Sequence, residues 1–165
     1  MEEVILVDIN DQEIGRMEKL EAHRKGLLHR ALSVFIFNSK HELLLQQRAL
    51  HKYHSAGLWT NTCCSHPRAG EQVIDAANRR LKEEMGMQAT LTCAGHFIYK
   101  TDLEHGLIEH ELDYVFFGNT NTEPILNIDE AAAFRWVSIL ELKREIQDAP
   151  HRFTYWFPIA LNKFF

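Results

Sequence analysis

Residues 71–85 carry the longest amphipathic pattern in a sequence that otherwise consists mainly of short apolar runs. The apolar positions of this segment recur with helical spacing, at Val73, Ile74, Ala77, Leu81 and Met85. Gly86 follows directly, and glycine is common where a helix ends. One long helix among strands has to bury its apolar face against a sheet, so the sequence favours an α+β fold.

The first apolar runs predict two hairpins. Turn residues separate residues 4–8 from 13–17, and residues 31–37 from 42–47. Residues 50–70 are rich in small and polar residues, and we expect them to form a long ordered loop.

The second half of the chain predicts further strands and two shorter helices. The expected strands are residues 91–101, 111–118 and 133–138. Ser138 and Glu141 have the spacing of a capping box, which predicts a helix to about residue 147. The aromatic segment 152–165 is expected to be helical. No linker or repeat divides the sequence, so we expect a single domain over residues 1–165.

Composition narrows the class of protein. The chain has 165 residues, three cysteines, and 18 basic against 23 acidic residues, which gives a formal charge of -5. Three cysteines are too few for a disulfide scaffold, and a mildly acidic chain is atypical of nucleic-acid binders. The N-terminal residues resemble no signal peptide, and no stretch is apolar enough for a membrane span. We therefore expect a cytoplasmic protein without nucleic-acid or membrane partners.

The helical segment contains a spaced set of charged residues. It reads EQVIDAANRRLKEEMGM over Glu71–Met87, and a solvated helix with acid–base pairs is the simple interpretation. The spacing also resembles the Nudix box, G-x5-E-x7-R-E-U-x-E-E-x-G-U, in which U is aliphatic. The matching positions are Glu71, Arg79, Leu81, Glu83, Glu84, Gly86 and Met87.

Two positions depart from the Nudix box. Ser65 replaces its first glycine, and Arg80 replaces the glutamate that follows the arginine. Nudix hydrolases use the glutamates to hold divalent cations against a diphosphate, since hard cations prefer carboxylate oxygens. Arg80 removes one such ligand and adds a cation, which suits a protein that binds a diphosphate without cutting it.

Three further stretches extend the resemblance over about residues 4–160. They are HRKGLLHRA from His23, WTNTCCSHP from Trp59, and EHE from Glu109. With the helix, these stretches resemble the type 1 isopentenyl diphosphate isomerases. That family has a Nudix-like fold with mixed β-sheets flanked by helices, and it interconverts isopentenyl and dimethylallyl diphosphate. The resemblance implies a small-molecule diphosphate as substrate and a monomer or homodimer.

The ten histidines raise the question of a metal site. In a strand, Glu109 and Glu111 point to one face and His110 to the other, and two carboxylates on one buried face need a cation or a proton between them. The metal ligands that the resemblance implies are His23, His29, His66, Glu109 and Glu111, which suit Zn²⁺ or Mn²⁺. We expect the remaining histidines to be surface residues: His41, His51, His54, His96, His105 and His151.

The reaction that the resemblance implies requires proton addition at one carbon and proton removal two carbons away. The implied groups are Glu111 with Tyr99 as proton donor and Cys64 as base, although the sequence leaves open which group protonates. A thiolate at Cys64 requires nearby positive charge to lower its pKa. Trp156 is the implied aromatic residue facing the carbocation. We expect Cys63 and Cys93 to be buried, inert thiols.

The diphosphate needs cationic partners. The positions that match the family's substrate-binding residues are Lys19, Arg48, Lys52 and Arg80. The resemblance also implies a Mg²⁺ ion that bridges the diphosphate, held by Glu84 and the backbone carbonyl of Cys64.

Two other functions remain open from the sequence. A Nudix-type diphosphohydrolase would want a glutamate at position 80 and has no use for Cys64 or for the Glu109/Glu111 pair. A non-catalytic metal-binding module would keep the histidines and glutamates without needing Cys64.

Overall fold

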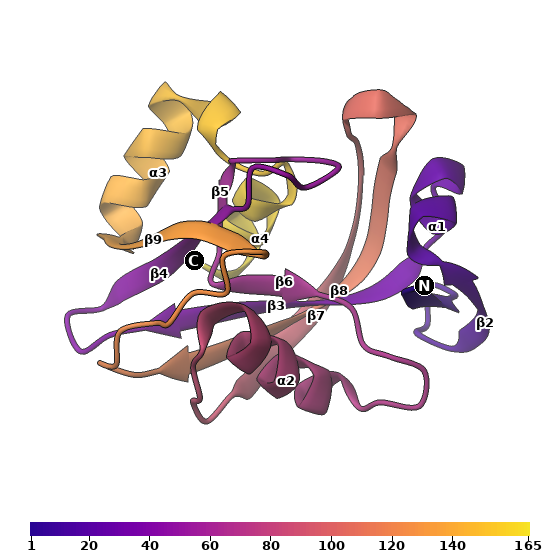
Figure 1. Ribbon diagram of the computed structural model, residues 1–165, viewed down its shortest axis with the longest axis horizontal. Coiled ribbons are helices and arrows are strands. Elements are labelled where there is room, and N and C mark those ends of the chain that lie inside the picture. Colours follow the sequence, from indigo (N-terminus) through magenta and orange to yellow (C-terminus); the bar gives the residue numbers. More distant parts are fainter.

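The computed structural model describes all 165 residues, which build a nine-stranded mixed sheet with helices on both sides (Figure 1). The strands are β1 (Glu3–Val7), β2 (Glu13–Glu18), β3 (His29–Phe37), β4 (Glu42–Arg48), β5 (Trp59–Thr60), β6 (Cys63–Ser65), β7 (Thr92–Asp102), β8 (Ile108–Asn119) and β9 (Ala131–Ser138). The helices are α1 (Lys19–Lys25), α2 (Val73–Met85), α3 (Ile139–Asp148) and α4 (Trp156–Phe164), with 3-10 turns at Glu104–Gly106 and Pro150–Arg152.

Strand β3 lies at the centre of the sheet. Leu32, Val34 and Ile36 belong to the core cluster under α2, whereas Phe35 faces the cluster that contains residues of α3 and α4. A strand that is buried on both faces has a continuous apolar sequence, which explains the run ALSVFIF. The α+β class and the mixed sheet flanked by helices are thereby confirmed.

The predicted hairpin of residues 31–37 and 42–47 is only partly right. Strands β3 and β4 pair at a single position, Phe37 with Leu43. Along the rest of its length β3 pairs in parallel with β8 and antiparallel with β6, while β4 pairs with β9 and β5. The turn residues bring the first residues of the two strands together. Beyond the turn the strands diverge, because burial of both faces of β3 favours pairing with strands that are distant in the sequence.

The predicted long loop at residues 50–70 contains the short strands β5 and β6. Strand β6 pairs with the centre of β3, with Ser33 opposite Cys64. This pairing places Cys64 next to the centre of β3, whose other edge pairs with β8.

Helix α1 was not predicted, because seven residues are too few to show helical periodicity. The carboxylate of Glu18 caps its first turn by accepting hydrogen bonds from the backbone N–H groups of Leu20 and Glu21. Gly26 ends the helix in the left-handed region, with φ of 64°.

The other helices follow the predicted signals closely. Helix α2 ends at Gly86, whose φ is 61°, and Ser138 Oγ accepts a hydrogen bond from Glu141 N at the start of α3. The final segment is helical only from Trp156, because Phe153 forms a β-bridge with Trp59 instead. No helix in the protein is both long and apolar enough to cross a membrane.

Candidate metal and proton-transfer site

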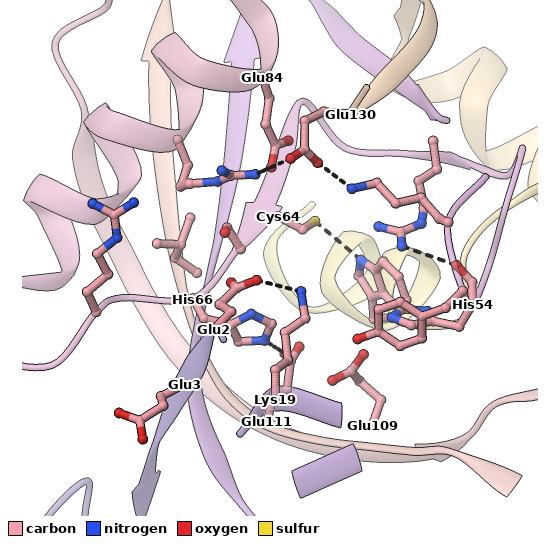
Figure 2. A pocket seen from close by; sticks show the side chains of 18 of the residues that line it. Glu2, Glu3, Lys19, His54, Cys64, His66, Glu84, Glu109, Glu111 and Glu130 are labelled. Carbon is pink, nitrogen blue, oxygen red and sulfur yellow. Dashed lines mark hydrogen bonds and ion pairs between the residues drawn. The ribbon is translucent and has the colours of Figure 1, made fainter. Parts of the chain in front are cut away.

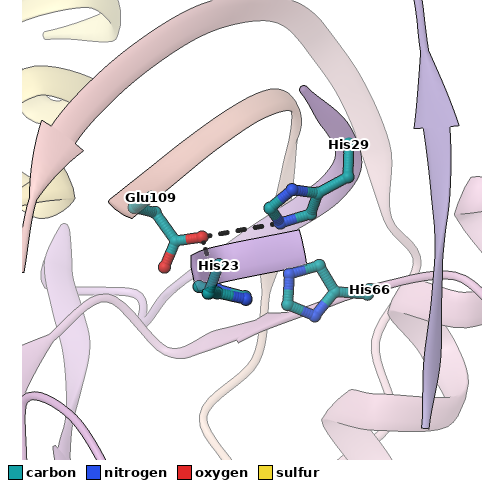
Figure 3. A group of neighbouring side chains, drawn as sticks. All are labelled: His23, His29, His66 and Glu109. Atoms are coloured by element: carbon teal, nitrogen blue, oxygen red, sulfur yellow. Dashed lines mark ion pairs between the residues drawn. The ribbon is translucent and has the colours of Figure 1, made fainter. Parts of the chain in front are cut away.

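Three histidines and one glutamate from four segments of the chain meet in one group (Figure 3). His23 lies on α1, His29 begins β3, His66 follows β6, and Glu109 is on β8. One ligand atom from each lies within 4.8 Å of the others. We call these four residues the His/Glu group.

Three buried atoms of the His/Glu group make no well-aligned hydrogen bond: His23 Nε2, His29 Nε2 and Glu109 Oε1. They face one another instead, because the Glu109 oxygen lies 2.9 Å from His23 Nε2 and 3.5 Å from His29 Nε2. The opposite ring nitrogens are already engaged, since His23 Nδ1 lies 2.6 Å from Lys19 O and His29 Nδ1 lies 2.9 Å from Leu27 O. Backbone carbonyls at Nδ1 keep the proton there and leave the Nε2 lone pair facing inward. Ring nitrogens and a carboxylate oxygen that converge in a buried place fit a divalent metal ion.

Glu111 lies at the edge of the His/Glu group. Its Oε2 is 2.7 Å from His66 Nε2 and 3.4 Å from His29 Nε2. The two glutamates therefore share one face of β8, as the alternation predicts, while His110 Nδ1 reaches Gly26 O away from them. All five residues expected as metal ligands thus come together.

Protonation of the histidines depends on these carboxylates. Burial opposes a charge on His29, but Glu109 and Glu111 outweigh it and raise its pKa to about 10. At His66 burial prevails and the pKa is lowered. A metal ion competes with the proton for the same nitrogen lone pair, so binding at His29 must displace a proton.

Tyr99 and Glu111 face each other across paired strands β7 and β8. The Tyr99 hydroxyl donates a hydrogen bond to Glu111 Oε1. Burial, with the nearby carboxylates, raises the pKa of Tyr99 well above its usual value. Burial also works against ionisation of Glu111, but His29 and His66 hold the pKa of Glu111 well below its usual value. The tyrosine therefore holds the proton of this pair.

Cys64 lies against Trp156 at the other side of the cavity. The Trp156 indole Nε1 donates a hydrogen bond to Cys64 Sγ at 3.3 Å, and the thiol donates to Asn61 Oδ1 at 2.9 Å. Burial, followed by the Asp113 carboxylate, raises the pKa of the Cys64 thiol to about 12. The lowering of this pKa that a resting thiolate would require is therefore not found, because no cationic side chain is among the groups that shift it.

A cavity of about 620 Å³ opens above these groups (Figure 2). All four side chains expected to bind the diphosphate line it: Lys19, Arg48, Lys52 and Arg80. Cys64, Glu84, Glu111 and Trp156 line it as well. A volume of this size accommodates a small molecule.

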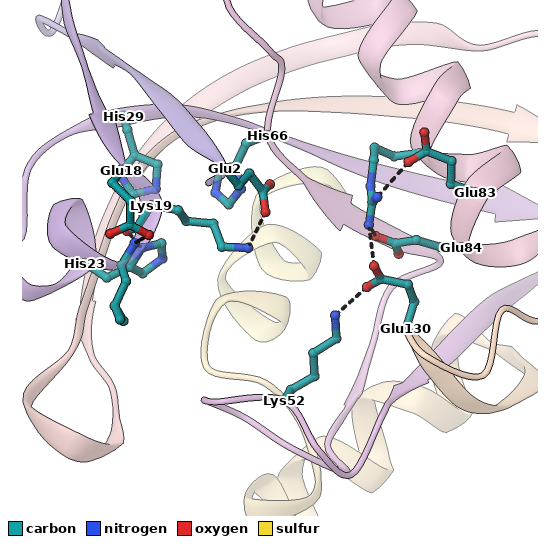
Figure 4. Close-up of polar contacts among 12 residues, drawn as sticks. Glu2, Glu18, Lys19, His23, His29, Lys52, His66, Glu83, Glu84 and Glu130 are labelled. Atoms are coloured by element: carbon teal, nitrogen blue, oxygen red, sulfur yellow. Dashed lines mark hydrogen bonds and ion pairs between the residues drawn. The ribbon is translucent and has the colours of Figure 1, made fainter.

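Three of these cations are paired with carboxylates (Figure 4). Lys19 Nζ lies 2.9 Å from Glu2 Oε2, and Lys52 forms an ion pair with Glu130. Arg80 Nη2 lies 2.6 Å from Glu84 Oε1 and 3.2 Å from Glu130 Oε1. The guanidinium of Arg80 thus stands between two carboxylates that would otherwise be available to a cation.

The Nudix-like helix uses its motif residues for structure as well. Arg79 makes two parallel bonds to Glu71, with Nε–Oε1 at 2.7 Å and Nη2–Oε2 at 2.9 Å. This bidentate pair ties α2 to the loop before it. Glu84 accepts a further hydrogen bond from Gln46 Nε2 at 2.9 Å.

Two expectations from the sequence are wrong. His54 is buried in the cavity wall, with 7% of its surface exposed, whereas it was expected on the surface. Cys93, expected to be buried, is exposed because it lies on the solvent side of β7, an edge strand. Cys63 is buried as expected, and the other five unassigned histidines are exposed.

Sequence reasoning also missed Asp113. This carboxyl is buried and accepts a hydrogen bond from Ser33 Oγ at 2.7 Å, while Ser33 Oγ lies 3.8 Å from Cys64 Sγ. The alternation that placed Glu109 and Glu111 on one face of β8 continues to Asp113, so the signal was present in the strand's periodicity.

Comparison with known proteins places this geometry in a family. A NUDIX domain model matches residues 27–157. An isopentenyl-diphosphate Delta-isomerase of Pectobacterium atrosepticum is 53% identical over 98% of this chain and 90% of its own length. Isopentenyl-diphosphate Delta-isomerase 2 of Photorhabdus laumondii is 50% identical, over 98% of this chain and 92% of its own length.

Solved structures with low identity share the fold. A Deinococcus radiodurans protein has a TM-score of 0.84 at 17% identity and covers 99% of both chains. A MutT protein from Methanosarcina mazei has a TM-score of 0.68 at 20% identity, over 83% of this chain and 92% of its own. The NUDIX domain thus describes the fold, whereas the relatives that are about 50% identical over nearly the whole chain specify the family. The chain belongs to the family of isopentenyl-diphosphate Delta-isomerases.

Proposed function

We propose that this protein interconverts isopentenyl diphosphate and dimethylallyl diphosphate by adding a proton at C4 and removing one at C2. One observation carries the proposal. The Tyr99–Glu111 pair and the Cys64–Trp156 pair belong to a single site whose cavity also holds cationic side chains. An allylic isomerase needs all of these features, whereas a diphosphohydrolase needs neither proton-transfer pair.

The proton donor in the direction of dimethylallyl diphosphate is Glu111 together with Tyr99. Glu111 is ionised in the resting protein and the Tyr99 hydroxyl carries the proton, so this proton can move along their hydrogen bond to Glu111 and from there to C4 of the alkene. Burial keeps both groups away from bulk water, which would compete for the transferred proton.

Cys64 is the partner at C2. In the resting protein its thiol is protonated, so that proton must leave to solvent through the cavity, which Cys64 lines, before the sulfur can act as base. The hydrogen bond available to stabilise the resulting thiolate comes from Trp156 Nε1, because the Ser33 hydroxyl donates its proton to Asp113. In the reverse direction the thiol is the acid and the Glu111 carboxylate is the base.

A tertiary carbocation lies between the two proton transfers. The indole of Trp156 can stabilise positive charge through its π-face and offers no nucleophile to capture the cation. Its Nε1 is held by Cys64, so the ring stands beside the carbon from which the proton leaves.

Binding of the diphosphate falls to Lys19, Arg48, Lys52 and Arg80. Arginine suits phosphate oxygens through its planar fork, and the ion pairs with Glu2, Glu84 and Glu130 keep three of the side chains extended before substrate arrives. Glu84 and the carbonyl of Cys64 would hold a Mg²⁺ ion that neutralises the diphosphate.

The His/Glu group, with Glu111, would hold Zn²⁺ or Mn²⁺. Such an ion supplies positive charge that lets Glu109 and Glu111 remain close together. Three imidazoles with carboxylates suit these borderline ions better than Mg²⁺, which prefers an all-oxygen shell. A monomer or homodimer in the cytoplasm remains our prediction.

The decisive assay uses isopentenyl diphosphate in D₂O. We expect dimethylallyl diphosphate that carries deuterium, because the added proton comes from an exchangeable group. Release of phosphate or diphosphate without isomerised product would contradict the proposal and favour a diphosphohydrolase.

A further inference from the structure

His54 occupies a central place in the cavity wall that neither the sequence motifs nor the proposed chemistry explains. It lies on the loop between β4 and β5, and 7% of its surface is exposed. The neighbouring His51 is exposed and does not line the cavity, whereas His54 does (Figure 2), so burial of His54 is not a property of the loop as a whole.

The His54 ring contacts both halves of the site. It stacks on His23, with ring centroids 5.7 Å apart and an interplanar angle of 30°. It also meets Trp156, at a centroid distance of 6.0 Å and an interplanar angle of 74°. The His54 ring therefore lies against one residue of the His/Glu group and against the indole that bonds Cys64.

The backbone around His54 is also tied down. Its carbonyl accepts a hydrogen bond from Arg48 Nη2 at 3.1 Å, and the guanidinium of Arg48 lies 5.6 Å from the Trp156 ring centroid. Ser55 adopts a left-handed conformation with φ of 53°, and its N–H donates to the Glu104 carboxylate on the β7–β8 hairpin. A non-glycine residue in this conformation persists only where its surroundings hold it.

We propose that His54 is a positioning residue that holds the indole of Trp156 against Cys64. Its ring fills the space between His23 and Trp156, so the indole cannot turn away from the reacting carbons. Removal of the ring leaves a void beside Trp156, and a rotated indole loses both the hydrogen bond to Cys64 and its face toward the cation. The diphosphate contacts are made by other side chains, so the effect falls on kcat rather than KM.

The kinetic test compares His54→Ala with His54→Phe in the metal-loaded enzyme, and it rests on the proposed function. We expect His54→Ala to lower kcat by about 10- to 100-fold, because small displacements of a positioned group have effects of this size. KM should stay within about threefold, a change worth well under 1 kcal/mol of binding. His54→Phe keeps an aromatic ring in place and should recover most of kcat.

His51→Ala is the matched control on the same loop. It removes an exposed imidazole three residues away, and we expect wild-type kcat and KM. Metal content should be the same in all variants, since His54 Nδ1 bonds Ser55 Oγ and His54 is not part of the His/Glu group.

A second measurement does not depend on activity. Near-ultraviolet circular dichroism of His54→Ala should differ from wild type because the surroundings of Trp156 change. The same substitution in a Trp156→Phe background should lose the tryptophan part of this difference and keep only the contribution of Tyr53, whose ring centroid lies 4.7 Å from that of His54. If wild-type enzyme fails to isomerise the substrate, the proposed function fails, and this spectroscopic comparison still tests the His54–Trp156 contact.

Three results would overturn the inference. One is unchanged kcat in His54→Ala, and another is a His54→Phe variant as slow as His54→Ala, which would assign the role to a ring nitrogen. The third is loss of metal from His54→Ala in proportion to its lost activity, which would place its action at the His/Glu group.

Discussion

Trp156 and Cys64 are 92 positions apart in the sequence, and the indole Nε1 of Trp156 donates a hydrogen bond to Cys64 Sγ across 3.3 Å. The contact joins the first turn of α4 to β6, a strand of three residues that pairs with the centre of the sheet.

Cys64→Ala should abolish isomerisation and leave diphosphate binding nearly intact. The thiol is the proposed proton carrier at C2, whereas the cationic side chains that bind the diphosphate are unchanged. Steady-state turnover and calorimetric binding of isopentenyl diphosphate measure the two properties separately. Cys93→Ala, at the exposed cysteine, is the control and should behave like wild type. Near wild-type turnover of Cys64→Ala would refute the assignment.

Glu111→Gln should lose both activity and metal. The amide cannot carry the catalytic proton, and it offers a neutral oxygen to His29 and His66 in place of a carboxylate. Elemental analysis of the purified variant and its turnover are the measurements. Tyr99→Phe separates the two roles, since it should retain metal while kcat falls. Full activity of Glu111→Gln with normal metal content would contradict the dual role.

Chelation should inactivate the enzyme, and Mg²⁺ together with Zn²⁺ or Mn²⁺ should restore it. Metal affinity should rise with pH, because the pKa of His29 in the metal-free protein is raised to about 10 and a proton must leave before metal binds. The stability of the metal-free fold depends on pH in the opposite direction. Protonated His29 stabilises the metal-free fold fully below about 6.5, its unfolded value, and this stabilisation is lost as pH rises toward 10. Metal titrations and thermal unfolding across this range test both signs; affinity that is independent of pH would contradict the argument.

Arg80→Ala should raise KM by about 10-fold or more, since a charge-assisted bond to phosphate contributes on the order of 1.5–3 kcal/mol. It should also leave Glu84 and Glu130 without their shared cationic partner. Lys82→Ala, an exposed residue of the same helix, is the matched control and should leave KM unchanged. Equal KM values for the two variants would show that Arg80 does not bind substrate.

Gly86→Ala should destabilise the fold by at least about 1–2 kcal/mol, the usual cost of a left-handed non-glycine residue. The added Cβ would also come within 2.5 Å of the Ile125 carbonyl oxygen. Gly70→Ala tests the conformational part alone, because Gly70 has φ of 76° and no atom lies within 4 Å of its Cβ position. Chemical denaturation should therefore show a larger loss for Gly86→Ala, and equal losses would exclude the close contact as a cause.

Helices, helix ends and strand faces could be predicted from the sequence because they depend on residues that are close together in the chain. Helix α2 was predicted from its apolar spacing and from Gly86, and α3 from the cap at Ser138. The shared face of Glu109 and Glu111 followed from strand alternation alone. The sequence did not predict helix α1 or strand β6, because elements of seven and three residues are too short to show a periodic pattern.

The identity of the site residues came from resemblance to a family, and their convergence came from the structure. Nothing in the spacing of His23 and His29, on different elements, indicates that their Nε2 atoms point at one carboxylate oxygen. His54 illustrates the reverse failure, since a histidine in a polar loop has the composition of a surface residue and is nevertheless buried.

Residue patterns alone were therefore sufficient for the α+β class, the main helices and most strands, because periodicity, caps and turns act over a few residues. Only the tertiary structure revealed the central position of β3, its pairing with β6 and β8, and the meeting of four chain segments at the His/Glu group. Those arrangements depend on burial of both sheet faces at once, a condition on residues far apart in the chain. The raised pKa of Cys64 has the same origin, because burial and neighbouring charge exist only once the chain has folded.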